Sequence, residues 1–279
     1  MKARKKWLLP ALVILAAAIL VVTLLRAFDT KMIVRRYEIK SEKVAEDVRI
    51  VLLTDYHCCD YGEGQRELLD AVTAQSPDLV LLAGDILDDT ARSWERAYAL
   101  TRALSAEYPT YYVSGNHEYW SGKAEEIKTA MEDCGAVILE GETQLLDMGG
   151  QSLMLCGVDD PDVGEQEWRR QLEQVSASAA GKEFSILLTH RPERAEDYTG
   201  RGFDLVVAGH AHGGQWRLPG IINGLYGPHQ GWFPKYAGGR YSLDDSTTMI
   251  VSRGLARETS RIPRIFNPPE LVVIDIRTP

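Results

Sequence analysis

The segment Leu79-Val80-Leu81-Leu82-Ala83-Gly84-Asp85 decides the fold, because it is a short apolar run that ends directly in a glycine and a carboxylate. A leucine- and valine-rich run of five residues that stops at glycine favours a buried strand over a helix. Open α/β sheets bind their ligands beyond the carboxyl ends of their strands. The segment therefore predicts an α/β fold with polar chemistry at the end of a strand.

Four more apolar runs end in the same way. Each is a few residues long and is followed at once by a cluster of aspartate, asparagine or histidine. The runs are Val48–Thr54, Thr110–Val113, Phe184–Leu188 and Leu205–Ala208, and the clusters are Asp55-Tyr56-His57, Gly115-Asn116-His117-Glu118, Thr189-His190 and Gly209-His210-Ala211-His212. We expect the five runs to be strands and their clusters to collect along one edge of a sheet.

The clusters combine the ligand types that hold catalytic divalent cations. Carboxylate and amide oxygens together with imidazole nitrogens are the mixture found at two-metal sites. The many imidazoles favour Mn, Fe or Zn over Mg or Ca. Phosphoester hydrolysis needs a nucleophilic hydroxide, in-line attack and positive charge on the phosphoryl oxygens, and two cations roughly 3.5 to 4 Å apart supply all three.

In chain order the five clusters read D-x-H, G-D, G-N-H-E, a single His and G-H-x-H, between positions 55 and 212. This pattern resembles the calcineurin-like metallophosphoesterases. The stretches Gly209–Gln215 (GHAHGGQ) and Ile265–Glu270 (IFNPPE) resemble a subgroup whose members often carry an N-terminal membrane segment. Tyr56 and Cys58-Cys59 depart from the small or aliphatic residues that are more usual there, which bears on the shape of the pocket wall.

The resemblance implies a fold and a set of metal ligands. The fold is a four-layer αββα sandwich of two mixed β-sheets flanked by helices. Asp85 corresponds to the family's bridging aspartate and would be shared by both metals. The other ligands are Asp55, His57 and His212 for the first metal, and Asn116, His190 and His210 for the second.

The resemblance also implies how the reaction proceeds. A hydroxide that bridges the metals would attack phosphorus in line. His117 would contact the phosphoryl group and protonate or stabilise the leaving oxygen, so that Asp85 and His117 are the catalytic residues. Asn116 and His117 would also bind substrate. Alternatively, His117 only supports a neighbouring ligand.

Each cluster alone has an ordinary explanation. Asp55-Tyr56-His57 and Gly84-Asp85 are compatible with turns, Asn116 with a helix cap, and His190 with a core histidine. For His210-Ala211-His212 the ordinary explanation and a metal site are equally favoured, because alternate residues of an extended segment share a face. One metal centre explains all five clusters, whereas the ordinary explanations need five independent accidents in the same order.

Composition limits the architecture and the partners. The 279 residues, with 45% hydrophobic and 25% charged types, suffice for one sizeable α/β domain and an appendage. The net charge of −9 argues against nucleic acid as a partner, since such proteins usually carry a basic excess. Small phosphates remain possible partners, because bound cations dominate the field inside a metal site. No oligomeric state is indicated.

The appendage is an N-terminal apolar segment. Trp7–Leu25 is almost unbroken aliphatic sequence and is long enough to cross a hydrocarbon core of about 30 Å as a helix. Because no A-x-A pattern follows, we expect a retained anchor and not a cleaved signal peptide. The predicted domains are a membrane anchor over residues 1–27 and a calcineurin-like phosphoesterase domain over residues 28–279.

Charges around the apolar segment bear on its orientation. A short basic tail precedes it, although basic residues also follow it. The two sets are Lys2, Arg4, Lys5 and Lys6 before the segment, and Arg26, Lys31, Arg35 and Arg36 after it. The tail favours a single-pass protein of the cell membrane with its catalytic domain on the extracytoplasmic side. The four cysteines have no spacing typical of a disulfide framework or a zinc knuckle, and we expect ordinary thiols.

Between the clusters the sequence predicts helices and a hairpin. Helices are expected over Thr90–Glu107, with capping residues Asp88-Asp89-Thr90, and over Tyr119–Asp133 and Gly164–Ala179. Gln144–Met148 and Ser152–Val158, joined at two glycines, predict a β-hairpin.

Two segments bear on the substrate. The loop Gln215–Tyr241 is rich in Gly, Pro and aromatics, which could receive an acyl chain, a sugar or a base, although we expect them to pack against the sheet. A basic run near the carboxyl end would either grip a second phosphate or lipid headgroups, or form a solvated face. Its members are Arg253, Arg257, Arg261 and Arg264.

These observations predict a membrane-anchored, dinuclear metal-dependent phosphohydrolase that acts on a lipid-linked or cell-envelope phosphoester or pyrophosphate. One alternative is a phosphodiesterase or phosphatase of a soluble, nucleotide-like substrate. Another is a binding module that retains metal without catalysis. The complete ligand set argues against the binding module, since such a protein has no need to keep His117.

Overall fold

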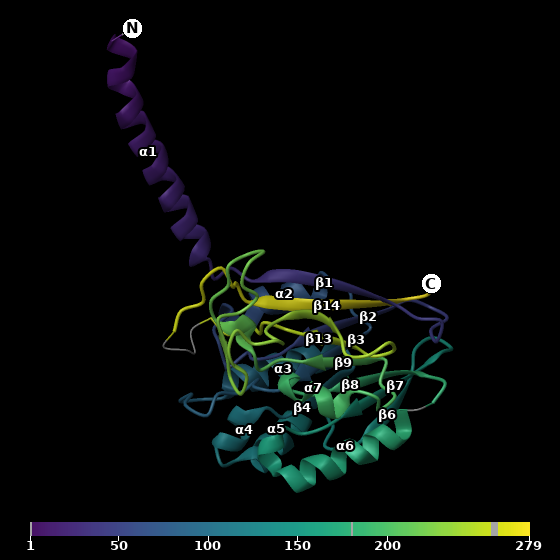
Figure 1. Cartoon of the computed structure of the whole chain (residues 1–279). Helices are drawn as coiled ribbons and strands as arrows, with labels where there is room; N and C mark the ends of the chain where they lie inside the picture. The colour runs from purple at the N-terminus through teal and green to yellow at the C-terminus, as the bar shows by residue number, and fades with distance from the viewer. Residues whose placement is uncertain (1, 180, 258–261) are drawn as a thin grey trace.

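Two six-stranded mixed sheets stack face to face, helices cover both outer faces, and the helix α1 (Lys2–Ala27) projects from this body (Figure 1). The computed structural model describes residues 2–179, 181–257 and 262–279. Arg261 of the predicted basic run lies outside the described residues.

The first sheet carries three of the polar clusters. Its strand order is β1-β14-β2-β3-β4-β5. The strands are β1 (Ile33–Lys40), β14 (Glu270–Arg277), β2 (Val48–Leu53), β3 (Leu79–Ala83), β4 (Thr110–Val113) and β5 (Val137–Ile138). Strand β14 runs antiparallel to β2, whereas β2, β3, β4 and β5 are parallel. The carboxyl ends of β2, β3 and β4 therefore meet at one edge.

The second sheet carries the other two clusters. Its order is β12-β13-β9-β8-β7-β6. The strands are β12 (Gly239–Ser242), β13 (Thr248–Val251), β9 (Leu205–Ala208), β8 (Phe184–Leu188), β7 (Ser152–Gly157) and β6 (Thr143–Asp147). Strands β7, β8, β9 and β13 are parallel, and β6 pairs antiparallel with β7 as the predicted hairpin.

Three apolar cores hold the four layers together. Alternate residues of β2 point to opposite sides: Ile50 and Leu52 pack between the sheets, whereas Val51 and Leu53 pack under helices. Because both faces are buried, these strands read as continuous apolar runs. The outer faces are covered by α2 (Arg66–Thr73), α3 (Glu95–Glu107) and α5 (Ala124–Asp133) on the first sheet, and by α6 (Glu165–Ala179) and α7 (Ala195–Tyr198) on the second. The predicted four-layer sandwich is confirmed.

Short elements complete the chain. These are α4 (Asn116–Trp120), the hairpin of β10 (Tyr226–Gly227) and β11 (Gly231–Trp232), and the 3-10 turns η1 (Glu63–Gln65), η2 (Pro161–Val163), η3 (Pro192–Arg194) and η4 (His212–Gly214).

Several sequence expectations need correction. The five predicted strands belong to two sheets and not to one, because β8 and β9 pair with β7 and β13. The helix expected from Thr90 begins at Glu95, since Asp88 and Asp89 contact histidines. The helix expected over residues 119–133 is divided between α4 and α5.

The loop aromatics and the basic run also differ from expectation. In the loop Gln215–Tyr241, Tyr236 and Tyr241 pack against the outer core of the second sheet. The other aromatics are exposed: Trp216 to 41%, Tyr226 to 46%, Trp232 to 68% and Phe233 to 64%. The described arginines of the basic run form ion pairs within the chain or are buried: Arg253 with Glu270, Arg257 with Glu67, and Arg264 against backbone carbonyls.

Helix α1 contains a candidate membrane span. Residues Leu9–Ala27 have a mean hydropathy of 2.5, which is apolar enough and long enough to cross a membrane. Side chains from Leu9 to Arg26 are all exposed, so nothing in the described chain covers this apolar surface. By length and composition, a lipid bilayer is a suitable environment for it.

A buried lysine joins α5 to the second sheet. Lys128, whose side chain is only 7% exposed, lies 3.0 Å from Asp159 and 2.6 Å from Glu140. Lys128→Met is expected to lower the free energy of unfolding by about 3–5 kcal/mol, because it leaves the Asp159 carboxylate buried without a counterion.

Thermal or urea unfolding of the full chain measures this effect. The matched control is Lys123→Met, which removes a lysine of the same region whose side chain is 53% exposed and pairs with Glu126. Its effect is expected to stay below about 1 kcal/mol. Equal destabilisation by the two variants would contradict the role given to Lys128.

Candidate metal centre

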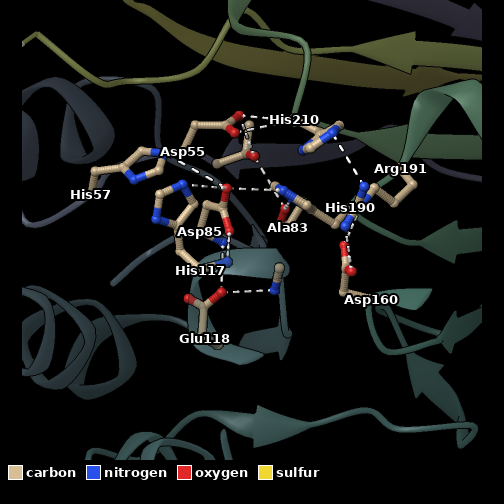
Figure 2. Close-up of polar contacts among 12 residues, drawn as sticks. Asp55, His57, Ala83, Asp85, His117, Glu118, Asp160, His190, Arg191 and His210 are labelled. Atoms are coloured by element: carbon tan, nitrogen blue, oxygen red, sulfur yellow. Dashed lines mark hydrogen bonds and ion pairs between the residues drawn. The ribbon is translucent and has the colours of Figure 1, made fainter. Parts of the chain in front are cut away.

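The polar clusters converge between the carboxyl ends of the two sheets. Asp55 and His57 follow β2, Asp85 follows β3, and Asn116 follows β4. From the second sheet come His190, after β8, and His210 and His212, after β9. The residues thus approach from two opposed strand rims, and Figure 2 shows the Asp85 carboxylate between the rings of His57 and His190.

The first group of ligand-type atoms contains two carboxylates and two imidazoles. One such atom from each of Asp55, His57, Asp85 and His212 lies within 4.8 Å of the others. His57 Nε2 is 3.7 Å from Asp85 Oδ2, and His212 Nε2 is 3.5 Å from Asp55 Oδ1. These are the residues that the sequence analysis assigned to the first metal.

The second group contains Asp85, His190 and His210, again within 4.8 Å of one another. His190 Nε2 lies 3.2 Å from Asp85 Oδ2. Asn116, which follows β4, is also buried, and its Oδ1 accepts no hydrogen bond from the described residues. Asp85 therefore takes part in both groups.

The backbone is unusual at these positions. A positive φ is uncommon outside glycine and persists where the surrounding structure imposes it, often at functional sites. Five of the seven predicted ligands have φ between 45° and 66°: Asp55, His57, Asp85, His210 and His212. The chain turns sharply at each strand end, which directs these side chains into the space between the sheets.

Two glycines allow the strand ends to approach each other. A Cβ on Gly84 would lie 2.7 Å from the backbone nitrogen of Gly115 and equally close to His190 Nδ1. A Cβ on Gly115 would overlap the Asp85 carboxylate. The glycines that precede Asp85 and Asn116 are therefore required by close packing of β3, β4 and His190.

The environment of His190 favours a positive charge between it and Asp85. Its Nδ1 donates a hydrogen bond to the Ala83 carbonyl at 2.7 Å, so the Nε2 of a neutral ring presents a lone pair to the Asp85 oxygen. Burial would lower the pKa of His190, but the Asp85 carboxylate raises it to about 10. A proton or a metal ion between them would satisfy both the His190 Nε2 lone pair and the Asp85 oxygen.

The rings of the G-H-x-H cluster have the opposite tendency. Burial and the nearby His190 lower the pKa of His210 well below the ordinary value. Burial and the nearby His57 lower the pKa of His212 in the same way. Both are therefore neutral, as metal-binding imidazoles must be. With the buried Asn116 oxygen and two carboxylates, the donor set fits two divalent cations.

The sequence places this architecture in a known group. The family model described as calcineurin-like phosphoesterase matches residues 48–214, which include every cluster of the site. The chain belongs to the calcineurin-like phosphoesterase family. Members hydrolyse phosphoester bonds and depend on two metal ions.

Individual relatives agree with this assignment. An uncharacterized metallophosphoesterase of Campylobacter jejuni is 29% identical over 88% of this chain and 63% of its own length. A Bos taurus transmembrane protein with metallophosphoesterase domain is 26% identical over 91% of this chain and 60% of its own. This chain thus spans less than two thirds of either relative.

A solved structure, that of GAP50, the anchor in the inner membrane complex of Plasmodium, covers 81% of this chain and 80% of its own with a TM-score of 0.50. At 11% sequence identity it supports the fold alone.

In this calcineurin-like phosphoesterase, adjacent aspartates support two of the histidines. Asp88 Oδ2 lies 3.2 Å from His57 Nδ1, and Asp89 Oδ1 lies 2.6 Å from His117 Nδ1. Carboxylates behind imidazoles fix ring orientation and tautomer. The sequence analysis missed both and assigned them to a helix cap. A pair of carboxylates three and four residues after Asp85 was the available signal.

Glu118 is a third carboxylate without an assigned role in the sequence analysis. It accepts hydrogen bonds at 2.8–3.1 Å from four backbone N–H groups, those of Gly115, Asp85, Ile86 and Leu87. Burial and the nearby Asp85 raise its pKa to about 7. By joining the turns after β3 and β4, Glu118 holds Asp85 and Asn116 in register.

The carboxyl-terminal stretch Ile265–Glu270 supports the other rim. The Asn267 amide donates to the His212 carbonyl at 2.7 Å and to the Gln215 carbonyl at 3.2 Å. A Cβ on Gly213 would overlap the Asn267 amide. The GHAHGGQ and IFNPPE stretches therefore form one interlocked unit around His212.

The sixth histidine also reaches the site. His229 comes from the loop after η4, and its Nδ1 lies 3.0 Å from His210 Nε2 and 2.8 Å from Arg191 Nη1. Arg191 donates a hydrogen bond to Asp160. Glu193 forms a cluster of ligand-type atoms with His210 and His229. No motif surrounds His229, so only its tertiary contacts reveal it.

Proposed function

We propose that this calcineurin-like phosphoesterase is a membrane-anchored phosphohydrolase with two metal ions, acting on lipid-linked or cell-envelope phosphoesters or pyrophosphates. The observation that carries the proposal is the Asp85 carboxylate, which is buried and common to two groups of ligand-type side chains. The proposed ligands are Asp55, His57, Asp85 and His212 for one ion, and Asp85, Asn116, His190 and His210 for the other.

When bound, the two cations supply a nucleophilic hydroxide and positive charge on the phosphoryl oxygens. Ligand chemistry favours Mn, Fe or Zn. The protein's own contribution is to hold the ligands still. Thr54 donates a hydrogen bond to Asp55 at 2.7 Å, and the His210 backbone N–H donates to the same carboxylate at 3.0 Å. The second of these contacts joins the end of β9 in the second sheet to the end of β2 in the first.

His117 has a different position from the proposed ligands. Its backbone N–H donates to Asp85 Oδ1 at 2.9 Å, and its partly exposed ring lies with Nε2 4.0 Å from Asp85 Oδ2. Asp89 accepts the Nδ1 hydrogen, which leaves Nε2 to face the space above Asp85. We propose that this nitrogen contacts the phosphoryl group and gives a proton to the leaving oxygen.

The proposed domain division is an anchor over residues 1–27 and a catalytic domain over residues 28–279. The exposed apolar surface of α1 supports the anchor, as does the Bos taurus relative named as a transmembrane protein. We place the catalytic domain on the extracytoplasmic side, because a basic tail precedes the span.

A lipid-linked substrate is favoured over a soluble one by an apolar cavity. A cavity of about 400 Å³ lined by Trp216, Leu225, Tyr226 and Trp232 shares Gln215 with a small pocket beside His212. A nucleotide would need polar partners for its base and sugar, which this lining lacks.

The test uses the full chain in lipid nanodiscs. Metal content is measured by mass spectrometry, and hydrolysis is measured on an aryl monoester, an aryl diester and a polyprenyl pyrophosphate. We expect close to two metal ions per chain, loss of all activity after chelation, and recovery on adding Mn²⁺ or Zn²⁺. Metal binding without hydrolysis of any substrate would favour a binding module, and selective hydrolysis of soluble esters would favour the nucleotide-like alternative.

A further inference from the structure

Exposed apolar side chains gather in two loops beside the metal centre. Outside α1, most of the strongly exposed large apolar residues that the structure describes lie in the loop after η4 and next to it. We call this set the apolar loop face; its members are Trp216, Leu218, Ile221, Tyr226, Trp232, Phe233 and Ile262. Ile221 is 78% exposed and Trp232 is 68% exposed. Apolar groups this large and this clustered usually mark an interaction surface.

Hydrogen bonds connect this face to the carboxyl end of α1. Trp216 pairs with Ile265 in a β-bridge, and its indole N–H donates to the Pro263 carbonyl at 3.0 Å. One residue further along, the Phe266 N–H donates to the Ala27 carbonyl at 2.7 Å. Figure 1 shows these green and yellow loops at the foot of α1. The face therefore lies beside the point where the apolar helix ends.

The same face contains the mouth of the apolar cavity. Trp216, Tyr226, Trp232 and Ile262 belong both to the face and to the lining of the cavity of about 400 Å³. Through Gln215 the cavity adjoins the small pocket lined by His212 and Arg264. The lining is thus apolar on the side of the face and polar on the side of His212.

We propose that the apolar loop face lies in the interfacial layer of the membrane that α1 spans, so that its cavity receives a hydrocarbon chain directly from the bilayer. This inference rests on the proposed anchoring by α1. Tryptophan and tyrosine are the residues enriched at membrane interfaces, where one side of the ring is apolar and the other is hydrated. Continuity with α1 selects the bilayer over a second copy of the chain, because the anchor keeps the face at the membrane surface.

The experiment uses an environment-sensitive NBD fluorophore attached to single introduced cysteines. The full chain, reconstituted at one copy per nanodisc, carries the label at Trp232→Cys or at Ile221→Cys. The second position guards against disturbance of the Tyr226–Trp232 ring contact. The native thiols are buried, and burial raises the pKa of Cys58 to about 12 and of Cys156 to about 11, so labelling favours the introduced cysteine.

The matched control is Leu145→Cys. Leu145 lies on β6, is 60% exposed, and belongs to the edge of the second sheet away from α1. We expect labels at 221 and 232 to show blue-shifted emission and strong quenching by lipids that carry a nitroxide on the acyl chain. The label at 145 is expected to show neither.

Other outcomes would overturn the inference. Emission at 221 and 232 equal to that at 145 would mean that the face is in water. A blue shift without quenching by the nitroxide lipids would place the labels against protein, as in a dimer. Release of the protein from vesicles by alkaline washing would contradict the anchoring by α1 itself. In the first two outcomes the chain stays with the lipid, so the three results can be told apart.

Discussion

Replacing Asp85 with asparagine is expected to empty at least one metal position and to lower hydrolysis by about 10²- to 10³-fold, the size typical for removing one preorganised electrostatic group. The charge is the essential property. Burial alone would raise the pKa of Asp85, but the nearby His190 lowers it well below the ordinary value and keeps the carboxylate ionised. Asparagine keeps the size of the side chain and an oxygen for the His117 N–H. A loss of metal would therefore follow from the lost charge and not from a collapsed loop.

Metal content by mass spectrometry and turnover of an aryl diester measure the effect. The matched control is Asp204→Asn, since Asp204 also accepts hydrogen bonds from backbone and side chain but precedes β9, at the end of the strand opposite the metal centre. The control is expected to keep both metals and normal turnover. An Asp85 variant that binds two metals and turns over normally would remove the shared carboxylate from the mechanism.

The strands were predictable from the sequence because their environment is uniform. Strands β3, β4, β8 and β9 begin and end where the apolar runs do, since their residues are almost all buried and only Thr110 and Ser185 among them have small polar side chains. Strand β1 differs, because most of its residues are exposed at a sheet edge and its sequence carries several charges. Such a strand has no clear apolar pattern.

The division into two sheets was not predictable from periodicity. Strand β14, at the carboxyl end of the chain, lies between β1 and β2, near its beginning. Pairings of this kind depend on contacts between residues more than two hundred positions apart, such as Ile274 with Ile50. The resemblance to a family implied two sheets, whereas the local pattern alone suggested one shared edge.

The residues assigned as ligands were accessible to sequence reasoning because each stands beside a strand end in a short motif. The supporting groups were less accessible. Asp88 and Asp89 look like helix caps, and Glu118 looks like an ordinary helix residue, although it accepts four backbone hydrogen bonds. His229 approaches His210 only through tertiary folding of the loop. Their roles depend on which chain segments meet.

The second large effect is expected from His117→Ala, which should lower turnover by about 10²- to 10⁴-fold, the range typical for loss of a proton-transferring group. Metal content should stay unchanged, because the ring lies outside the two groups of ligand-type side chains that share Asp85. The turnover of substrates with good leaving groups should suffer least, since these need little help from a proton donor. A series of aryl diesters with leaving groups of different pKa measures this dependence.

Asp89→Asn provides the matched comparison. It removes the charge behind His117 Nδ1 but keeps a hydrogen-bond acceptor, so we expect a smaller loss of about 10- to 100-fold, as for other carboxylates that orient a histidine. If Asp89 acts through His117, the double variant should turn over no more slowly than His117→Ala alone, because the ring that Asp89 orients is already absent. Additive losses would separate the two residues. Loss of metal from His117→Ala would instead reassign His117 as a ligand, in keeping with its place near His57 and Asp88.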